Sequence, residues 1–384
     1  MRTVFLRAAV LGLLLILAVS CGGGNPTSEL KPPPLCTPSS KPAFAYVLND
    51  GDNTISMFTV DSCTGHLAPT TPATVATGAN NFGSEEMAVD PAGKFVYVAN
   101  LGSNATDLAT VSMYTINSST GVLTPTTPAT VATGFFPQGI AIDPSGKFVY
   151  TANSDDNTVS MFTINSSTGV LTPTTPPSVA TGWSPLSVTV DPSGRFAYAA
   201  NQDDDTVSMY SVNASTGVLT PLTPATVPTG GSPFGVTVDP SGKFAYVPNA
   251  YDPNNTVSQY TVDSVTGVLT PNTPSAVTAG GSPTSVAVDP SGKFAYVVNR
   301  QDNTVSMFTI NPSTGSLTLN GTIATGTQPF RILVDPSGKF AYVTNENSAS
   351  VSIYTLNSDG TLTEAGAAST GSAPVSVAVT GTKQ

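Results

Sequence analysis

Hydrophobic and polar positions alternate in short runs along most of the chain, and no run after residue 20 has the spacing of a helix. One phrase, Asp-Pro-Ser-Gly-Lys-Phe-Ala-Tyr-Val at residues 239–247, has near-identical copies whose Asp stands at positions 90, 143, 191, 289 and 335. The phrase predicts a β-hairpin, because a strand ends at Asp, Pro and Gly supply a tight turn, and a second strand alternates large and small apolar residues. A further copy at residues 44–47 lacks the turn.

The hairpin belongs to a longer repeat. Its Phe recurs every 46 to 53 residues, which is the period of propeller blades, and each unit holds four strand-like segments. In one unit these segments cover residues 187–190, 196–200, 205–213 and 218–227. Pro221 and Pro224 lie in the fourth segment. Because proline cannot donate a ladder hydrogen bond, we place this segment at a sheet edge, as in a four-stranded antiparallel blade.

The order of the segments predicts how the repeats close. The chain has seven copies of the second strand and seven of the first, but it begins with a second strand at Phe44 and ends with a first strand at residues 374–379. The C-terminal strand is therefore expected to complete blade 1. We predict an all-β fold, a seven-bladed β-propeller of four-stranded antiparallel blades, over residues 42–384.

Two motifs carry a family resemblance. Tyr342-Val343-Thr344-Asn345 matches the Tyr-Val-Thr-Asn propeller repeat. The longer repeat is similar over residues 43–380 to the seven-bladed lactonase family, which includes 6-phosphogluconolactonase and the fungal muconate cycloisomerase. The resemblance implies the propeller fold and, as one possible activity, lactone hydrolysis. Its repeated residues are the structural ones, so it speaks for fold more than for activity.

The resemblance also implies catalytic positions. Enzyme members carry Pro-Arg-His at the start of a first strand and Asn-Glu after the next strand. The matching segments here are Pro329-Phe330-Arg331 and Asn345-Glu346, so Glu346 fits while Arg331 stands at the position of the histidine. Glu86 occupies the place equivalent to Arg331 in another blade, where the remaining copies have Gly or Ser. Glu346, Arg331 and Glu86 are the catalytic candidates, and the last two either orient a ligand or form a structural ion pair.

The two rims of the predicted ring differ in charge. We define the upper rim as the loops before each first strand and between the second and third strands, and the lower rim as the opposite side. The formal net charge is −11, and the upper rim has thirteen acidic residues against two bases, Arg300 and Arg331. On the lower rim, six turn aspartates face six Lys or Arg. The upper rim is expected to attract cationic or neutral ligands and to oppose nucleic acid.

Irregularly placed aromatic residues also fall on the upper rim. They accompany polar residues that we expect to bind a ligand or partner; this set comprises Phe82, Glu85, Phe135, Phe136, Gln138, Trp183, Phe234, Tyr251, Arg300 and Phe330. An aromatic, acidic surface favours recognition, although several of these rings could instead plug the channel. No cofactor is expected; the metal alternative is Ca²⁺ at Asp203, Asp204 and Asp205, whose carboxylates could equally cap loops.

The N-terminus predicts export. Residues 1–20 contain Arg2, Arg7 and an apolar run too short to span a bilayer. Ala18-Val19-Ser20-Cys21 resembles a bacterial lipoprotein cleavage box with Cys21 as the lipidated residue, the alternative being an ordinary secretory signal. Residues 21–41 are expected to be a flexible linker. The resemblance to a lipoprotein implies that the protein is anchored to the outer membrane, on its periplasmic side or at the cell surface, with the lipid as the sole membrane contact.

Two cysteines remain for that oxidising compartment, and the topology brings both Cys36 and Cys63 to the lower rim, so we predict a disulfide between them. Three functions stay open. The first is a monomeric binding or scaffold module for an unidentified protein or ligand. The second is a lactone hydrolase, although the only histidine, His66, is expected on the lower rim. The third is a structural surface protein.

Overall fold

The computed structural model describes residues 42–78, 83–102, 108–250 and 255–380. The chain divides into two units, Met1–Thr37 and Pro38–Gln384, and only the second is considered below. The predictions for the signal segment, Cys21, the linker and Cys36 fall outside the described residues. Within the described stretches, no helix has the length and apolar character needed to cross a bilayer.

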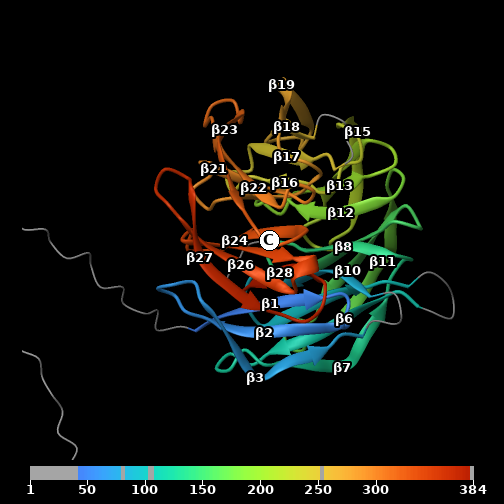
Figure 1. Ribbon diagram of the computed structural model, residues 1–384. Coiled ribbons are helices and arrows are strands. Elements are labelled where there is room, and N and C mark those ends of the chain that lie inside the picture. Colours follow the sequence, from blue (N-terminus) through green and yellow to red (C-terminus); the bar gives the residue numbers. More distant parts are fainter. Residues whose placement is uncertain (1–41, 79–82, 103–107, 251–254, 381–384) are drawn as a thin grey trace, which may run out of the picture. The chain divides into compact units, whose positions relative to one another are not determined.

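The described strands form seven sheets of four antiparallel strands each, which confirms the predicted seven-bladed propeller (Figure 1). Blades are numbered along the chain and their strands are given from the channel outward. Blade 1 has β28 (Pro374–Val379), β1 (Ala43–Asn49), β2 (Thr54–Val60) and β3 (Leu67–Ala76). Blade 2 has β4 (Ser84–Val89), β5 (Phe95–Asn100), β6 (Thr110–Ile116) and β7 (Leu123–Ala132). Blade 3 has β8 (Pro137–Ile142), β9 (Phe148–Asn153), β10 (Thr158–Ile164) and β11 (Leu171–Ala180).

The remaining blades repeat this order. Blade 4 has β12 (Pro185–Val190), β13 (Phe196–Asn201), β14 (Thr206–Val212) and β15 (Leu219–Pro228). Blade 5 has β16 (Thr237–Val238), β17 (Phe244–Pro248), β18 (Thr256–Val262) and β19 (Leu269–Thr278). Blade 6 has β20 (Pro283–Val288), β21 (Phe294–Asn299), β22 (Thr304–Ile310) and β23 (Leu317–Ala324). Blade 7 has β24 (Pro329–Val334), β25 (Phe340–Asn345), β26 (Ser350–Leu356) and β27 (Leu362–Ser369), with a 3₁₀ turn η1 (Glu346–Ser348) after β25.

The ring closes as the sequence predicts. The last strand, β28, pairs antiparallel with the first, β1, so Val377 lies opposite Val47 within blade 1 (Figure 1). The proline-rich fourth strands are the outer edges of their sheets, also as predicted. Closure leaves no blade at the end of an open row, and each sheet keeps two edge strands, the proline-rich one outside and the innermost one facing the channel.

A tyrosine in each second strand fastens its blade to the next. Each of these seven tyrosines is fully buried and donates its hydroxyl to a glycine carbonyl in the following blade. Tyr198 donates to Gly267 over 2.7 Å, and Tyr342 of blade 7 donates to Gly65 of blade 1 over 3.0 Å. The phenolic oxygens would be unsatisfied in the core without these carbonyls. The repeated Tyr is therefore a structural residue that links blades around the whole ring.

Blade 5 departs from the others on the channel side. Its innermost strand β16 has two residues, whereas the innermost strands of the other blades have six. Pro248 stands in β17 opposite Gly235, where other blades have a residue whose backbone N–H can donate to the innermost strand. Since proline cannot donate to the ladder, the pairing is interrupted between the Pro233–Asn249 bridge and Thr237. The wall of the channel is consequently more open at blade 5.

Candidate functional site

The innermost strands of all seven blades line a central channel with a cavity of about 170 Å³. One residue per blade occupies the same place on this wall, the third position of the innermost segment. We call these seven residues the inner ring: Glu86, Gly139, Ser187, Gly235, Ser285, Arg331 and Ser376. They differ from blade to blade, unlike the second strands behind them.

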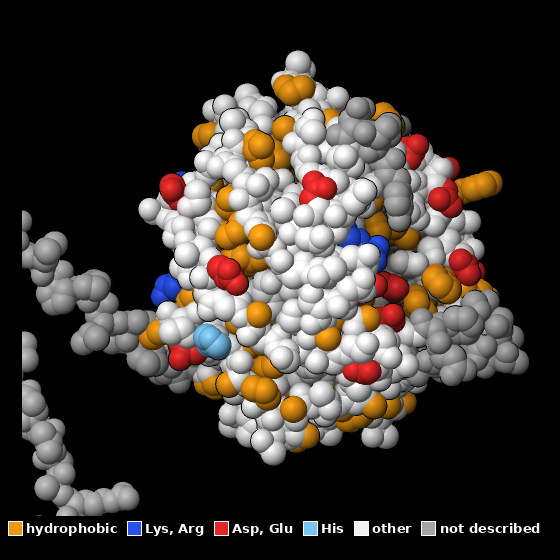
Figure 2. Space-filling model, in the orientation of Figure 1, with side chains coloured by type: hydrophobic (Ala, Val, Ile, Leu, Met, Phe, Trp, Pro, Cys, Tyr) orange, Lys and Arg blue, Asp and Glu red, His pale blue; other side chains and the backbone are white. Residues whose placement is uncertain are grey.

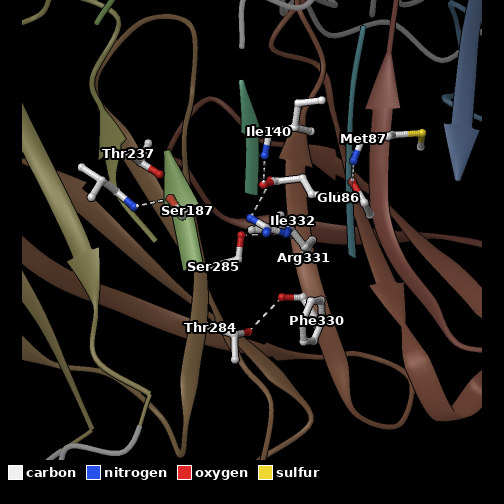
Figure 3. A network of polar contacts seen from close by, with 12 residues as sticks. Glu86, Met87, Ile140, Ser187, Thr237, Thr284, Ser285, Phe330, Arg331 and Ile332 are labelled. Carbon is white, nitrogen blue, oxygen red and sulfur yellow. Dashed lines mark hydrogen bonds and ion pairs between the residues drawn. The ribbon is translucent and has the colours of Figure 1, made fainter. Parts of the chain in front are cut away.

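The inner ring is tied together by hydrogen bonds between neighbouring blades. A ring side chain accepts the backbone N–H of the residue that follows the ring position in the next blade. Glu86 accepts Ile140 N–H over 3.0 Å, Ser187 accepts Val236 N–H over 3.3 Å, and Ser285 accepts Ile332 N–H over 3.4 Å (Figure 3). Ser376 accepts Met87 N–H over 3.4 Å. These bonds satisfy inward-facing N–H groups that have no strand partner on the channel side.

Two ring residues form an ion pair. Arg331 Nη1 lies 2.9 Å from Glu86 Oε1, and the side chains are 19% and 16% exposed (Figure 3). Burial raises the pKa of Glu86, while Arg331 and the Ile140 N–H lower it. Of the two roles left open for these residues, the structure therefore has the ion pair. Both side chains line the channel cavity, so the ion pair can still contact a ligand.

A second ion pair lies beside the first. Arg300, which follows β21, and Glu346, which begins η1, are joined by a short contact of 2.5 Å. The Arg300 guanidinium also lies over the Phe330 ring, 5.3 Å from its centroid, and Phe330 meets Phe234 edge to face at 5.5 Å. Phe330 is only 7% exposed, so it supports the pair and packs the mouth of the channel rather than forming an exposed surface.

Carboxyl groups crowd this mouth. The pKa of Glu85 is raised to about 7, first by burial and then by the Asp50 carboxylate, while Arg331 opposes the shift. Glu346 and Glu86 are also close enough to raise the pKa of Glu85. The pKa of Asp50 is raised by burial as well, although Asp50 accepts Ser84 N–H over 2.9 Å. We call Asp50, Glu85, Glu86, Arg300, Arg331 and Glu346 the mouth cluster.

Among the described residues, two guanidinium nitrogens of the mouth cluster are left without a hydrogen-bond partner. The Nε atoms of Arg300 and Arg331 are buried and make no hydrogen bond to any residue in the described part of the chain. Figure 2 shows basic and acidic side chains meeting in a hollow of one face, with further Asp and Glu side chains around it. The site thus combines guanidinium donors, a carboxyl group that titrates near neutrality, and an adjoining cavity.

Comparison with known proteins identifies the family. A family model described as lactonase, 7-bladed beta-propeller matches residues 37–183 and 187–379. The chain belongs to this seven-bladed lactonase family. Its structure is similar to that of a candidate 6-phosphogluconolactonase from Bacteroides fragilis, with a TM-score of 0.75, 22% identity, and coverage of 89% of this chain and 99% of that one. It is also similar to the periplasmic gluconolactonase of Pseudomonas aeruginosa, with a TM-score of 0.71, 20% identity, and coverage of 88% and 99%.

These structural likenesses show a shared fold. No curated protein sequence matches the chain. Glu346 and Arg331, the two residues matched to the lactonase family motif, are both close enough to Glu85 to affect its pKa. The catalytic candidate Glu86 is the ion-pair partner of Arg331, and the binding candidate Arg300 is the ion-pair partner of Glu346.

Other predicted binding residues lie away from the mouth cluster. The Trp183 side chain is 67% exposed, and the backbone N–H of Trp183 donates to the Asp204 carboxylate over 2.7 Å. Phe135 has the equivalent place in blade 3 and donates its N–H to Asp156 over 2.6 Å. Phe135, Phe136 and Gln138 are partly exposed, while Phe82 and Tyr251 lie outside the described residues.

The aspartate group considered for Ca²⁺ is engaged locally. Asp204 caps the Trp183 N–H, and Asp205 accepts Ser232 N–H over 2.7 Å. No group of three metal-ligating side chains is arranged around one point in the described stretches. Cys63 is disulfide-bonded, and the other cysteines, Cys21 and Cys36, lie outside the described residues.

Sequence reasoning missed two members of the site. Asp50 appears in the sequence only as one of many loop acids, and its effect on Glu85 depends on the contact between blades 1 and 2. Gly235 appears as one of several small residues at its ring position. The signal that could have singled it out is Pro248, which replaces a residue with an N–H in that blade alone.

Proposed function

We propose that the mouth cluster hydrolyses a small neutral lactone. The observation that carries the proposal is the pKa of Glu85, raised to about 7 beside the Arg331 guanidinium in a propeller of the lactonase family. A general base works best when its pKa lies near the operating pH. The Arg331 guanidinium, which lines the cavity, is suited to hold a carbonyl oxygen as it becomes negative.

The reaction would use one water molecule. The Glu85 carboxylate takes a proton from the water while the water oxygen bonds to the carbonyl carbon. The negative charge that develops on the carbonyl oxygen is stabilised by Arg331. The ring C–O bond then breaks, and the ring oxygen receives the proton held by Glu85, giving a hydroxy acid. No histidine is expected at this site, so in this proposal Glu85 takes the role of the general base.

Charge limits the substrate. The mouth cluster contains four carboxyl groups, Asp50, Glu85, Glu86 and Glu346, against two arginines. Each arginine already pairs with a carboxylate. A phosphorylated lactone would therefore meet an acidic site in which both arginines of the mouth cluster are already paired. An uncharged lactone avoids this repulsion.

The test is hydrolysis of γ-butyrolactone, glucono-δ-lactone and 6-phosphogluconolactone, each corrected for its spontaneous rate. We expect turnover of the neutral lactones that rises through about pH 7 as Glu85 loses its proton. Glu85→Gln should lower kcat by roughly 10²- to 10⁴-fold. Trp183→Ala, remote from the mouth, is the matched control and should keep the activity. Equal rates in Glu85→Gln and the unaltered protein would refute this role.

A second candidate is recognition of a cationic partner, for which the exposed Trp183 is the specific observation. An exposed tryptophan beside Asp203 and Asp204 suits a cation–π contact supported by carboxylates. Trp183 is the chain's single tryptophan, so its fluorescence reports on this surface directly. We expect poly-lysine to shift the emission in a salt-dependent way, and an unchanged spectrum would remove this candidate. Lipid anchoring at Cys21 would hold either activity at the outer membrane, and mass spectrometry of the N-terminal peptide tests it.

A further inference from the structure

Two glycines interrupt the inner ring, and they have different physical causes. A Cβ atom added to Gly139 would lie 2.7 Å from the Ser187 Cα and 2.9 Å from the Leu186 carbonyl oxygen. The innermost strands of blades 3 and 4 approach too closely for any side chain there, so packing requires glycine. Gly235 has no such requirement, because its nearest neighbour to an added Cβ would be the Ser187 Oγ at 3.7 Å.

Gly235 leaves an inward-facing N–H without its usual acceptor. In the repeated pattern, the ring side chain of one blade accepts the N–H that follows the ring position in the next. The group that Gly235 would serve is Val286 N–H. The Val286 carbonyl accepts the Thr237 hydroxyl of blade 5 over 2.7 Å. Because the N–H and C=O of one strand residue point to the same side, Val286 N–H faces this wall as well.

The surroundings supply further donors and space. Ser187 and Ser285 each use their oxygen to accept a backbone N–H, which leaves their hydroxyl hydrogens free to turn toward the channel. Arg331 contributes its guanidinium from blade 7 (Figure 3). Pro248 lines the same cavity because the strand pairing of blade 5 is interrupted there. Several hydrogen-bond donors therefore line this wall of the channel.

We propose that the carbonyl oxygen of a small lactone ring occupies the space left by Gly235 and accepts the Val286 N–H. This inference rests on the proposed function and names the binding position of the substrate, which we call the seat. A cavity of about 170 Å³ is close to the roughly 150 Å³ that holds a benzene-sized ring. A ring lactone of about six heavy atoms fits this volume, whereas a sugar lactone would project into the mouth.

The charges around the seat favour binding of the substrate over binding of the product. The lactone is neutral and enters an acidic mouth without repulsion. Hydrolysis converts it to a carboxylate in a cavity that the Glu86 carboxyl group also lines. The guanidinium of Arg331 is already paired with Glu86, so it neutralises this new charge only in part. The product is therefore bound less tightly than the substrate, and its release is favoured.

The experiment measures binding of γ-butyrolactone and of 4-hydroxybutyrate by NMR titration in the Glu85→Gln protein, in which hydrolysis is slow. Gly235→Ser in that background should weaken γ-butyrolactone binding at least 10-fold, because the new hydroxyl accepts Val286 N–H as Ser187 accepts that of Val236. Gly235→Ala adds a methyl group but no acceptor, and it should weaken binding only about threefold. The Tm of both variants should stay within a few degrees of the parent, since an added Cβ has room.

Unchanged γ-butyrolactone binding in Gly235→Ser would overturn the inference, and so would equal losses in the Ser and Ala variants, which would leave space alone as the cause. Tighter binding of 4-hydroxybutyrate than of γ-butyrolactone would overturn the direction of charge. Because the readout is binding, it is separate from the hydrolysis assay. Hydrolysis without this binding pattern would reject the binding position at Gly235 and leave the proposed function standing. Binding without hydrolysis would reject the proposed function and leave the binding position standing.

Discussion

The second strand of each blade and the inner-ring segment beside it follow opposite rules. The second strands are nearly identical, and their seven tyrosines are all completely buried and bonded to the next blade. The inner-ring segments share a place in the fold but not a chemistry, since they include Glu85-Glu86, Phe330-Arg331 and Leu186-Ser187. A framework that fixes position so firmly lets neighbouring blades differ at the channel. The chemistry of the channel wall therefore varies at about two residues per blade.

The largest expected effect comes from the variable side of this comparison. Arg331→Met removes the guanidinium proposed to hold the carbonyl oxygen and leaves Glu86 without its ionic partner. We expect kcat/KM for γ-butyrolactone to fall by roughly 10²- to 10³-fold. Steady-state kinetics measures it. Lys339→Met, on the lower rim, is the control, and a comparable loss there would mean that the effect is not specific to the mouth.

The two glycines of the ring offer a sharper contrast in stability. Gly139→Ala forces a methyl group against the blade 4 backbone, so we expect the free energy of unfolding to fall by about 1–3 kcal/mol. Gly235→Ala should change it by less than about 0.5 kcal/mol, since the site is open. Denaturant melts of the two variants decide the matter. Equal destabilisation would mean that both glycines are kept for packing.

On the constant side, Tyr198→Phe deletes one bond between blades 4 and 5. The Gly267 carbonyl then loses a buried donor, so we expect a loss of about 1–2 kcal/mol in unfolding free energy. Lactone hydrolysis, in contrast, should be unchanged, because the hydroxyl lies behind the channel wall. A variant with unaltered stability but reduced activity would contradict the division between framework and site.

The smallest effect is a pH dependence of stability. The pKa of Glu85 rises from 4.5 to about 7 on folding, so between these values the folded state binds a proton that the unfolded state has lost. Stability contributed by this proton is complete below about pH 4.5 and is lost as the pH rises through about 7. Glu85→Gln should therefore match the unaltered protein near pH 4 and exceed it by about 1 kcal/mol near pH 8, after allowance for solvent screening. Thermal melts at both pH values measure the difference, and a constant offset would rule the titration out.

The same division explains what the sequence could predict. The hairpin phrase, the Pro221-type edge strands and the closing strand depend on local residue preferences repeated many times, so the whole architecture followed from them. The partner of Glu346 depends on how blades 6 and 7 meet, and the pKa of Glu85 depends on burial between several blades. Neither has a local pattern. Phe330 looked like a rim aromatic in sequence, but its place in β24 turns it inward against Phe234.

The pairing of β28 with β1 sets a condition on assembly. Ribosomes make the chain from its amino end, so β1 is made long before its partner β28. The two strands are nearly 330 residues apart, and β28 follows all the other described strands. Until residues 374–379 emerge, blade 1 has an open edge and the row of blades has two unjoined ends. The ring can close only after residues 374–379 have been made, and the hydrogen bond from Tyr342 to Gly65 then also joins blade 7 to blade 1.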